Sequence, residues 1–194
     1  MGRCLFRRRL RRQLRQEIGM IEIIKATPED ASLVARLHVW GWRDGYAGLL
    51  PQAYLDSLSI AERTERWHKN LADGSTLWIA NYDHEPAAII GFGSPLNPVP
   101  AGLDNCGEIT MIYTLAKFYR RGIGEQLFNH ACTSLKDQGF KCCYLWCLEE
   151  NIKGRSFYDK MGGKIVPDAE EIALIDGQPF KEIAYHWALS SIIF

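Results

Sequence analysis

The sequence predicts one α/β domain, in which strands and helices alternate along most of the chain. Its 194 residues are 47% hydrophobic and include equal numbers of acidic and basic side chains, 23 of each. A chain of this length builds one well-buried core more readily than two. Apolar runs of strand length alternate with segments whose apolar residues recur at helical spacing. No apolar run reaches the roughly eighteen residues that cross a bilayer, so we expect a soluble protein.

The amino-terminal half is expected to hold a strand, three helices and a hairpin. Thr27 followed by Pro28 is typical of a helix start, because threonine caps the first turn and proline suits its first position. Ser59 is expected to cap a later helix in the same way. Residues 83–86 separate two apolar runs and predict the turn of a hairpin. The expected elements are a strand at 21–25, helices at 27–42, 52–56 and 60–71, and strands at 76–81 and 87–92.

The carboxy-terminal half is expected to begin with a loop and to end in strands. Residues 94–106 include three prolines, which disfavour both helix and strand. Beyond this loop, apolar runs and helical patterns alternate twice before three short runs close the sheet. The expected elements are strands at 108–114 and 142–148, helices at 122–136 and 152–161, and closing strands at 164–166, 172–175 and 181–189.

The segment 118–125, Phe-Tyr-Arg-Arg-Gly-Ile-Gly-Glu, is predicted to bind a pyrophosphate. It follows a predicted strand and opens a predicted helix, so backbone N–H groups point outward at the positive end of the helix dipole. Gly122 and Gly124 lack a Cβ and allow phosphate oxygens to approach the main chain, while Arg120 and Arg121 add positive charge. The alternative is a glycine turn that begins a helix and binds nothing.

A second motif, Asn-Ile-Lys-Gly-Arg-Ser-Phe-Tyr at 151–158, follows the strand predicted at 142–148. Together with the glycine turn it resembles the GNAT family of N-acetyltransferases, whose members carry Q/R-x-x-G-x-G/A and Asn-x-x-Ala-x-x-Phe-Tyr. Tyr119 stands where that family prefers Gln or Arg, and Gly154 where it prefers Ala. The resemblance covers about residues 21–189. It includes residues 38–51, whose His-x-x-x-Trp-Arg and Tyr-x-Gly-Leu-x-Pro patterns are typical of one large bacterial branch.

The resemblance implies a three-layer fold and a coenzyme site. A mixed, largely antiparallel sheet would carry helices on both faces, with two parallel strands splayed apart where acetyl-CoA binds as co-substrate. No metal is implied. Asn151 would bond the pantetheine arm, and a backbone amide near 111–113 would stabilise the oxyanion. The implied coenzyme contacts are Ile112, Tyr113, Thr114, Arg120, Arg121, Gly122, Ile123, Gly124, Glu125 and Asn151.

Acetyl transfer to an amine requires a base and an acid. An alkyl ammonium with a pKa of about 10 must lose a proton before it attacks, and the departing thiolate must gain one. The resemblance assigns the acid to Tyr158 and the base to Glu108, at the start of the central strand. The alternatives are a tyrosine that packs on the sheet and a solvated glutamate. His38 and Tyr46 lie in the region expected to wall the acceptor site, with a structural role as the alternative for His38.

The predicted activity is direct acetyl transfer from acetyl-CoA to an amine of a small cationic molecule. We expect no nucleic acid or membrane partner, and a monomer or homodimer. Protein lysine or N-terminal acetylation is one alternative, although Trp146 stands where enzymes that acetylate the N-terminus of a ribosomal protein place a catalytic Glu. A non-catalytic acyl-CoA-binding module is another, and the retained Tyr158 argues against it.

Residues 1–19 are expected to form a disordered, arginine-rich extension ahead of a single acetyltransferase domain at 20–194. Seven arginines and one glutamate give the extension a net charge of +6, so the remaining residues carry −6 and attract cations. One alternative is a basic amphipathic helix, because apolar residues recur every fourth position. A transit peptide is another, although the usual serines are missing. We interpret Met20 as the natural start. The recurring residues are Phe6, Leu10, Leu14 and Ile18.

Six cysteines lie at positions 4, 106, 132, 142, 143 and 147. They show neither paired C-x-x-C spacing nor a supporting histidine cluster, which argues against both zinc and a disulfide framework. Cys143 and Cys147 would share one face of a strand, with Cys142 on the other. We interpret them as buried thiols in a reducing cytoplasm.

Overall fold

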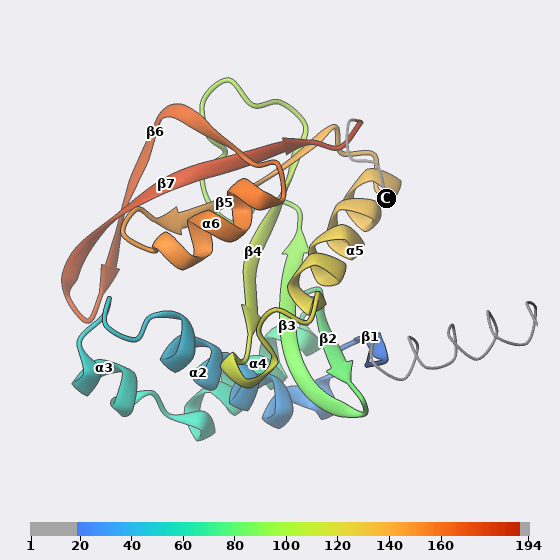
Figure 1. Ribbon diagram of the computed structural model, residues 1–194, viewed down its shortest axis with the longest axis vertical. Helices are drawn as coiled ribbons and strands as arrows, with labels where there is room; N and C mark the ends of the chain where they lie inside the picture. The colour runs from blue at the N-terminus through green and yellow to red at the C-terminus, as the bar shows by residue number, and fades with distance from the viewer. Residues whose placement is uncertain (1–18, 191–194) are drawn as a thin grey trace, which may run out of the picture.

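The computed structural model describes residues 19–190, which form a seven-stranded sheet flanked by helices (Figure 1). The described strands lie in the order β1-β2-β3-β4-β5-β7-β6, and among them only β4 and β5 pair in parallel. This arrangement confirms the predicted mixed, largely antiparallel sheet. The strands are β1 (Ile21–Lys25), β2 (Leu77–Tyr82), β3 (Glu85–Gly93), β4 (Cys106–Thr114), β5 (Cys142–Leu148), β6 (Lys164–Ile175) and β7 (Gln178–Ala188).

The helices lie close to their predicted positions. Ser59 caps α4 as expected, because its Oγ accepts a 3.2 Å hydrogen bond from the amide of Glu62. The Thr27-Pro28 start produces a 3-10 turn rather than the first turn of the long helix, so α2 begins later than predicted. The helical elements are η1 (Pro28–Asp30), α2 (Ala31–Gly45), α3 (Gln52–Ser57), α4 (Ile60–Ala72), η2 (Ala116–Phe118), α5 (Ile123–Asp137) and α6 (Ile152–Lys160). None of these described helices is both long and apolar enough to span a bilayer.

The hairpin between β2 and β3 turns through two residues with left-handed backbones. Asp83 has a φ of 49° and His84 a φ of 66°. Positive φ at both central residues is the geometry whose twist matches a two-residue hairpin. The predicted hairpin is therefore confirmed.

The last part of the sheet differs from the prediction. The runs expected at 164–166 and 172–175 are one long strand, β6, whose register against β7 shifts between Ile165 and Glu170. Pro167 lies within this irregular stretch, and an edge strand tolerates proline because its outer side needs no ladder hydrogen bond. The residues between the two predicted strands, which the sequence indicates as a loop, therefore form a bulge within one strand.

The parallel pair separates soon after it forms. The register of β4 with β5 covers Cys106–Cys142, Gly107–Cys143 and Glu108–Tyr144. Beyond that row, β4 continues against β3, while β5 continues against β7. The two strands therefore diverge and leave main-chain groups facing a gap between them.

The cysteine interpretation was wrong for one pair, because Cys106 and Cys142 form a disulfide. The two residues are direct partners in the parallel register, with Cα atoms 4.5 Å apart, although 36 positions separate them in the chain. Only the strand pairing brings them together, so their spacing could not reveal it. Cys143 and Cys147 are buried free thiols, as predicted, and Cys132 is a third.

Candidate active site

A cavity of about 770 Å³ opens where β4 and β5 diverge. Its walls come from α2, β4, the turn before α5, and α6. Nine of the ten predicted coenzyme contacts line it, together with the predicted acid Tyr158. The predicted residues in the lining are Ile112, Tyr113, Thr114, Arg120, Gly122, Ile123, Gly124, Glu125, Asn151 and Tyr158.

The glycine turn is built from left-handed residues. Gly122 has a φ of 79° and is the residue that immediately precedes α5, while Arg120 has a φ of 62°. A left-handed arginine is uncommon and costs free energy, so the surrounding structure must hold the turn. The first backbone N–H groups of α5 lack helical acceptors and adjoin the cavity, which suits them to bind an anion.

Gly124 lies at a close contact between α5 and α6. A Cβ at this position would stand 3.4 Å from the Phe157 ring and 3.6 Å from Oγ1 of Thr114. Arg121, in contrast, is not brought to the cavity. Its guanidinium lies 4.8 Å from the centre of the Tyr82 ring, on the outside of the turn.

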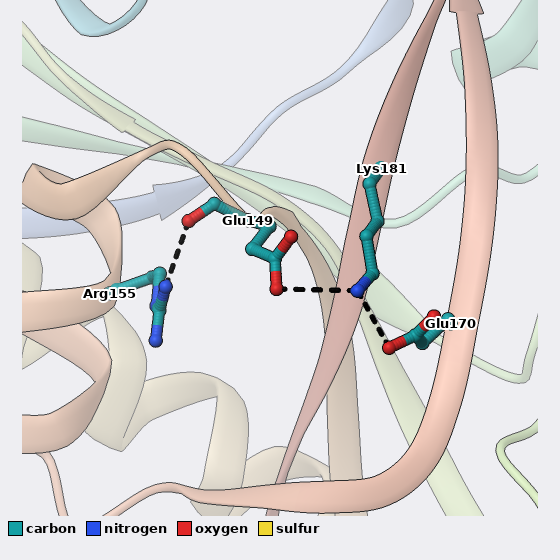
Figure 2. A network of polar contacts seen from close by, with 4 residues as sticks. All are labelled: Glu149, Arg155, Glu170 and Lys181. Atoms are coloured by element: carbon teal, nitrogen blue, oxygen red, sulfur yellow. Dashed lines mark hydrogen bonds and ion pairs between the residues drawn. The ribbon is translucent and has the colours of Figure 1, made fainter.

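The turn between β5 and α6 is fixed by a polar network (Figure 2). Arg155 donates a 2.9 Å hydrogen bond to the carbonyl oxygen of Glu149. Lys181 on β7 lies 3.4 Å from the Glu149 carboxylate and 2.7 Å from that of Glu170. Within the turn, Oδ1 of Asn151 accepts a 3.0 Å hydrogen bond from the amide of Gly154 and caps α6. The cap uses Oδ1 of Asn151, and the residue also lines the cavity.

Tyr158 lines the cavity and packs against two aromatic rings. Its ring contacts those of Tyr185 and Trp187, with centroids 5.5 and 6.1 Å away. Burial raises the pKa of Tyr158 well above its ordinary value, and the neighbouring Cys147 and Tyr113 raise it further. The hydroxyl therefore keeps its proton at neutral pH, as a proton donor must.

Cys147 is a poor nucleophile despite its proximity to Tyr158. Burial, assisted by the charge of Glu182, raises the pKa of the Cys147 thiol to about 12. Since the thiolate is the reactive form of cysteine, the side chain is almost entirely unreactive at neutral pH. The site therefore favours direct transfer over a covalent acyl-cysteine. Among residues 19–190, no group of three or more His, Cys, Asp or Glu is arranged to hold a metal.

An aromatic wall borders the side of the cavity formed by α2. Tyr46 and Tyr113 line the cavity, and His38 stacks on Tyr113 with ring centroids 5.5 Å apart. The pKa of His38 is lowered to about 3 by burial, with smaller effects of Arg63 and a second arginine, so the ring is neutral. Trp40, also on α2, does not join this wall and is 41% exposed.

Glu108 lies outside the cavity and holds a loop. Only 1% of its surface is exposed, and its carboxylate accepts hydrogen bonds from the amides of Leu96 and Asn97, at 2.6 and 3.0 Å, and from the Asn97 side chain. Tyr144 fixes the same loop by donating a 2.9 Å hydrogen bond to the carbonyl oxygen of Asn97. The catalytic role of Glu108 stays a prediction.

Two charged residues near the cavity were not found from the sequence. Arg63 on α4 lies 5.2 Å from the centre of the Trp42 ring and 3.2 Å from Nε2 of His38. Glu182 on β7 raises the pKa of both Tyr113 and Cys147. Their local sequences resemble those of solvated helix and strand residues, so only the tertiary structure indicates their position.

Known proteins are similar to this chain in sequence and in structure. The model of the Acetyltransferase (GNAT) family matches residues 35–163. The "Uncharacterized N-acetyltransferase YuaI" of Bacillus subtilis is 29% identical over 170 residues, which cover 87% of this chain and 93% of that protein. The "Probable N-acetyltransferase Rv2775" of Mycobacterium tuberculosis is 32% identical over 143 residues, or 72% and 78% of the two chains.

A solved structure gives the same result for the fold. The PaiA N-acetyltransferase of Thermoplasma acidophilum, in complex with coenzyme A, is similar with a TM-score of 0.60 and 20% identity, over 87% of this chain and 99% of that one. The family match at residues 35–163 covers more than half of the sequence. The chain therefore belongs to the Acetyltransferase (GNAT) family and is an acyltransferase.

Proposed function

We propose that this protein transfers an acetyl group directly from acetyl-CoA to the amine of a small cationic molecule. The observation that carries the proposal is the cavity beside the end of β4, beyond the point where β4 and β5 diverge, which unites the glycine turn, Asn151 and Tyr158. The coenzyme A complex of the Thermoplasma protein supports the choice of co-substrate.

In this proposal the coenzyme lies with its pyrophosphate on residues 120–125. The amides at the start of α5 and the guanidinium of Arg120 would bind the phosphate oxygens. The pantetheine arm would pass between the strands, where backbone groups of residues 112–114 bond it like an added strand. The side-chain NH₂ of Asn151, which the helix cap leaves available, would donate a further hydrogen bond.

Bond making and proton transfer then follow from the geometry. The amine nitrogen forms a bond to the acetyl carbon, a backbone amide near 111–113 binds the oxyanion, and the C–S bond breaks. Tyr158 gives its proton to the departing thiolate and regains one from solvent. Burial raises the pKa of Tyr158 and would raise that of the enclosed thiol in the same direction.

The acceptor would enter opposite the coenzyme, between residues 38–51 and the loop 94–105. Residues 38–51 carry the pattern expected of the bacterial branch, and Tyr46 from this stretch already borders the cavity. The net charge of −6 on residues 20–194 would raise the local concentration of a cation. Glu108 is the base predicted from the resemblance, and it would reach the amine only if the loop released its carboxylate.

The test is a screen of the full chain with acetyl-CoA against amines. The panel contains polyamines, amino acids, aminoglycosides, lysine peptides and free N-terminal peptides, with thiol release and product mass as readouts. A small cationic amine should give the highest kcat/KM, and its rate should fall as salt screens the attraction. A peptide as best acceptor would favour protein acetylation, and coenzyme binding without turnover would favour a binding module.

A further inference from the structure

We infer that Glu182 on β7 is the carboxylate that binds the ammonium group of the acceptor and accepts its proton. The inference rests on the proposed acetyl transfer and assigns its base to a residue other than Glu108. It is carried by the position of Glu182 in the sheet, by the groups around its carboxylate, and by the absence of a partner for its charge within residues 19–190.

The sheet register places Glu182 level with the wide end of the gap, on the strand next to β5. Glu108 pairs with Tyr144, which pairs in turn with His186, so Glu108 lies in the last row before β4 and β5 diverge. Glu182 pairs with Leu148, four residues further along β5. At about 3.3 Å per residue, its row lies roughly 13 Å beyond that of Glu108, towards the cavity.

Glu182 shares two neighbours with Tyr158. Its charge is close enough to raise the pKa of Tyr113 on β4 and of Cys147 on β5. Those same two side chains raise the pKa of Tyr158, the proposed acid. A proton acceptor and a proton donor therefore flank one pair of residues, of which Tyr113 lines the cavity, as an amine attacking a thioester requires.

The charge of Glu182 is not compensated by the protein. Its side chain is half-buried, and the described residues provide no ion pair or hydrogen bond to its carboxylate. The preceding Lys181 binds Glu149 and Glu170 instead (Figure 2). A half-buried carboxylate without a cation is costly, and an ammonium ligand would remove that cost.

The groups that face Glu182 also suit it to accept a proton. Burial raises its pKa, and the like charge of Glu171, its register partner on β6, raises it further. Tyr113 and Cys147 face it from β4 and β5 in their neutral forms, and Arg63 acts on Tyr113 from α4. A raised pKa makes the carboxylate a stronger base.

The proton balance is simple. One N–H proton of the bound ammonium passes to a carboxylate oxygen of Glu182, and the freed lone pair attacks the acetyl carbon. As the C–S bond breaks, Tyr158 gives its proton to the thiolate, and the second proton that the nitrogen loses passes to solvent, from which Tyr158 is reprotonated. After the amide leaves, Glu182 gives the proton to water and regains its negative charge. The reaction needs no co-reactant beyond acetyl-CoA and the amine.

The experiment compares kcat/KM across pH for the wild type, Glu182→Gln, Glu171→Gln and Glu108→Gln, with the best amine of the screen. Glu182→Gln should lower kcat/KM by about a hundredfold or more and remove the acidic limb of the profile, with acetyl-CoA affinity unchanged. Glu171→Gln is the matched control, because it removes the neighbouring charge and keeps the base. Its kcat/KM should stay near that of the wild type, while the acidic limb moves to lower pH.

The outcomes separate the two hypotheses. If Glu108→Gln removes the acidic limb and Glu182→Gln keeps it, the inference is overturned and the proposed acetyl transfer stands. If the acidic limb of Glu171→Gln lies at the same pH as that of the wild type, the inference is also overturned. This second result tests the inference even if Glu182→Gln does not fold. If the wild type binds acetyl-CoA but acetylates no amine, the proposed function fails and the inference falls with it.

Discussion

The indole nitrogen of Trp67 donates a 3.0 Å hydrogen bond to Nδ1 of His38. Indole is only a donor, so Nδ1 must be unprotonated and any imidazole proton must lie on Nε2. The bond joins α4 to α2, and His38 in turn stacks on Tyr113 at the cavity wall. The pair thus links the helical layer to the wall of the cavity, and it requires a neutral histidine.

We expect acid to destabilise the fold through His38. Its pKa falls from 6.5 to about 3 on folding, so between these values the unfolded chain binds a proton that the native chain excludes. The contribution of neutral His38 to the free energy of unfolding is therefore fully present above pH 6.5. It is lost as the pH falls towards 3, by about 1.4 kcal/mol per pH unit. Urea unfolding from pH 7 to pH 4 should show this slope for the wild type.

His38→Gln is the control for this slope. A glutamine oxygen can accept the hydrogen bond from Trp67 but does not titrate, so the variant should lack the contribution of His38. The difference between the two free energies of unfolding, plotted against pH, isolates that contribution from those of the other groups. Parallel curves would contradict the assignment.

The disulfide between Cys106 and Cys142 should contribute measurable stability. It closes a loop with a sequence separation of 36 residues, and loop-closure entropy predicts at most about 4 kcal/mol for a loop of this size. Cys106→Ser should therefore lower the free energy of unfolding in the absence of reductant. The same substitution should have a much smaller effect when the wild type is reduced.

A chemical count provides an independent check of the bridge. Mass spectrometry would count the alkylated thiols in two denatured samples, one of which is reduced before alkylation. The unreduced sample should carry two fewer alkyl groups than the reduced one. Equal uptake in the two samples would show that the thiols are free.

The sequence predicts the features that depend on local signals. The glycine turn, the Asn-to-Tyr motif and most element positions follow from patterns within about fifteen residues, and the structure places nine of the ten expected coenzyme contacts around one cavity. Arg121 differs because its side chain turns away to Tyr82, a contact between distant parts of the chain.

What the sequence does not predict depends on strand pairing. Cys106 and Cys142 meet through the parallel register, and β6 is continuous because β7 supports its bulge. Likewise, Glu182 lies level with the wide end of the gap because it pairs with Leu148. Register is set by packing between distant segments, so a single sequence carries little information about it.

The glycine turn can be tested with a matched pair of substitutions at position 124. Gly124→Ala adds a Cβ at ordinary contact distances and should bind acetyl-CoA nearly as well as the wild type. Gly124→Asp adds a negative charge beside the proposed phosphate site. Its affinity should fall about tenfold or more, since a charge-assisted hydrogen bond is worth about 1.5–3 kcal/mol. Calorimetry measures both variants.

The helix itself should not explain a loss of affinity in Gly124→Asp. An acidic residue in the first turn is favourable to the helix dipole, so α5 should remain folded. Circular dichroism and the melting temperature verify this. If both substitutions leave the affinity unchanged, the pyrophosphate lies elsewhere.

A control is available for the proposed acid, Tyr158. Tyr185 is an adjacent buried phenol, but its hydroxyl donates a 3.1 Å hydrogen bond to Asp159 rather than facing the cavity. Tyr185→Phe should therefore lower the melting temperature while kcat changes little. It measures the cost of removing a phenolic oxygen from this part of the core without removing a proton donor.

Tyr158→Phe should fold, bind acetyl-CoA with unchanged affinity, and turn over about a hundredfold or more slowly, because only the proton donor is lost. The pH profile adds a second test. Since burial raises the pKa of Tyr158 well above its ordinary value of 10.0, the wild type should show no basic limb from this residue at any pH below 10. A wild-type kcat in Tyr158→Phe would show that water protonates the thiolate, and an unchanged affinity in that variant would confine the error to the acid.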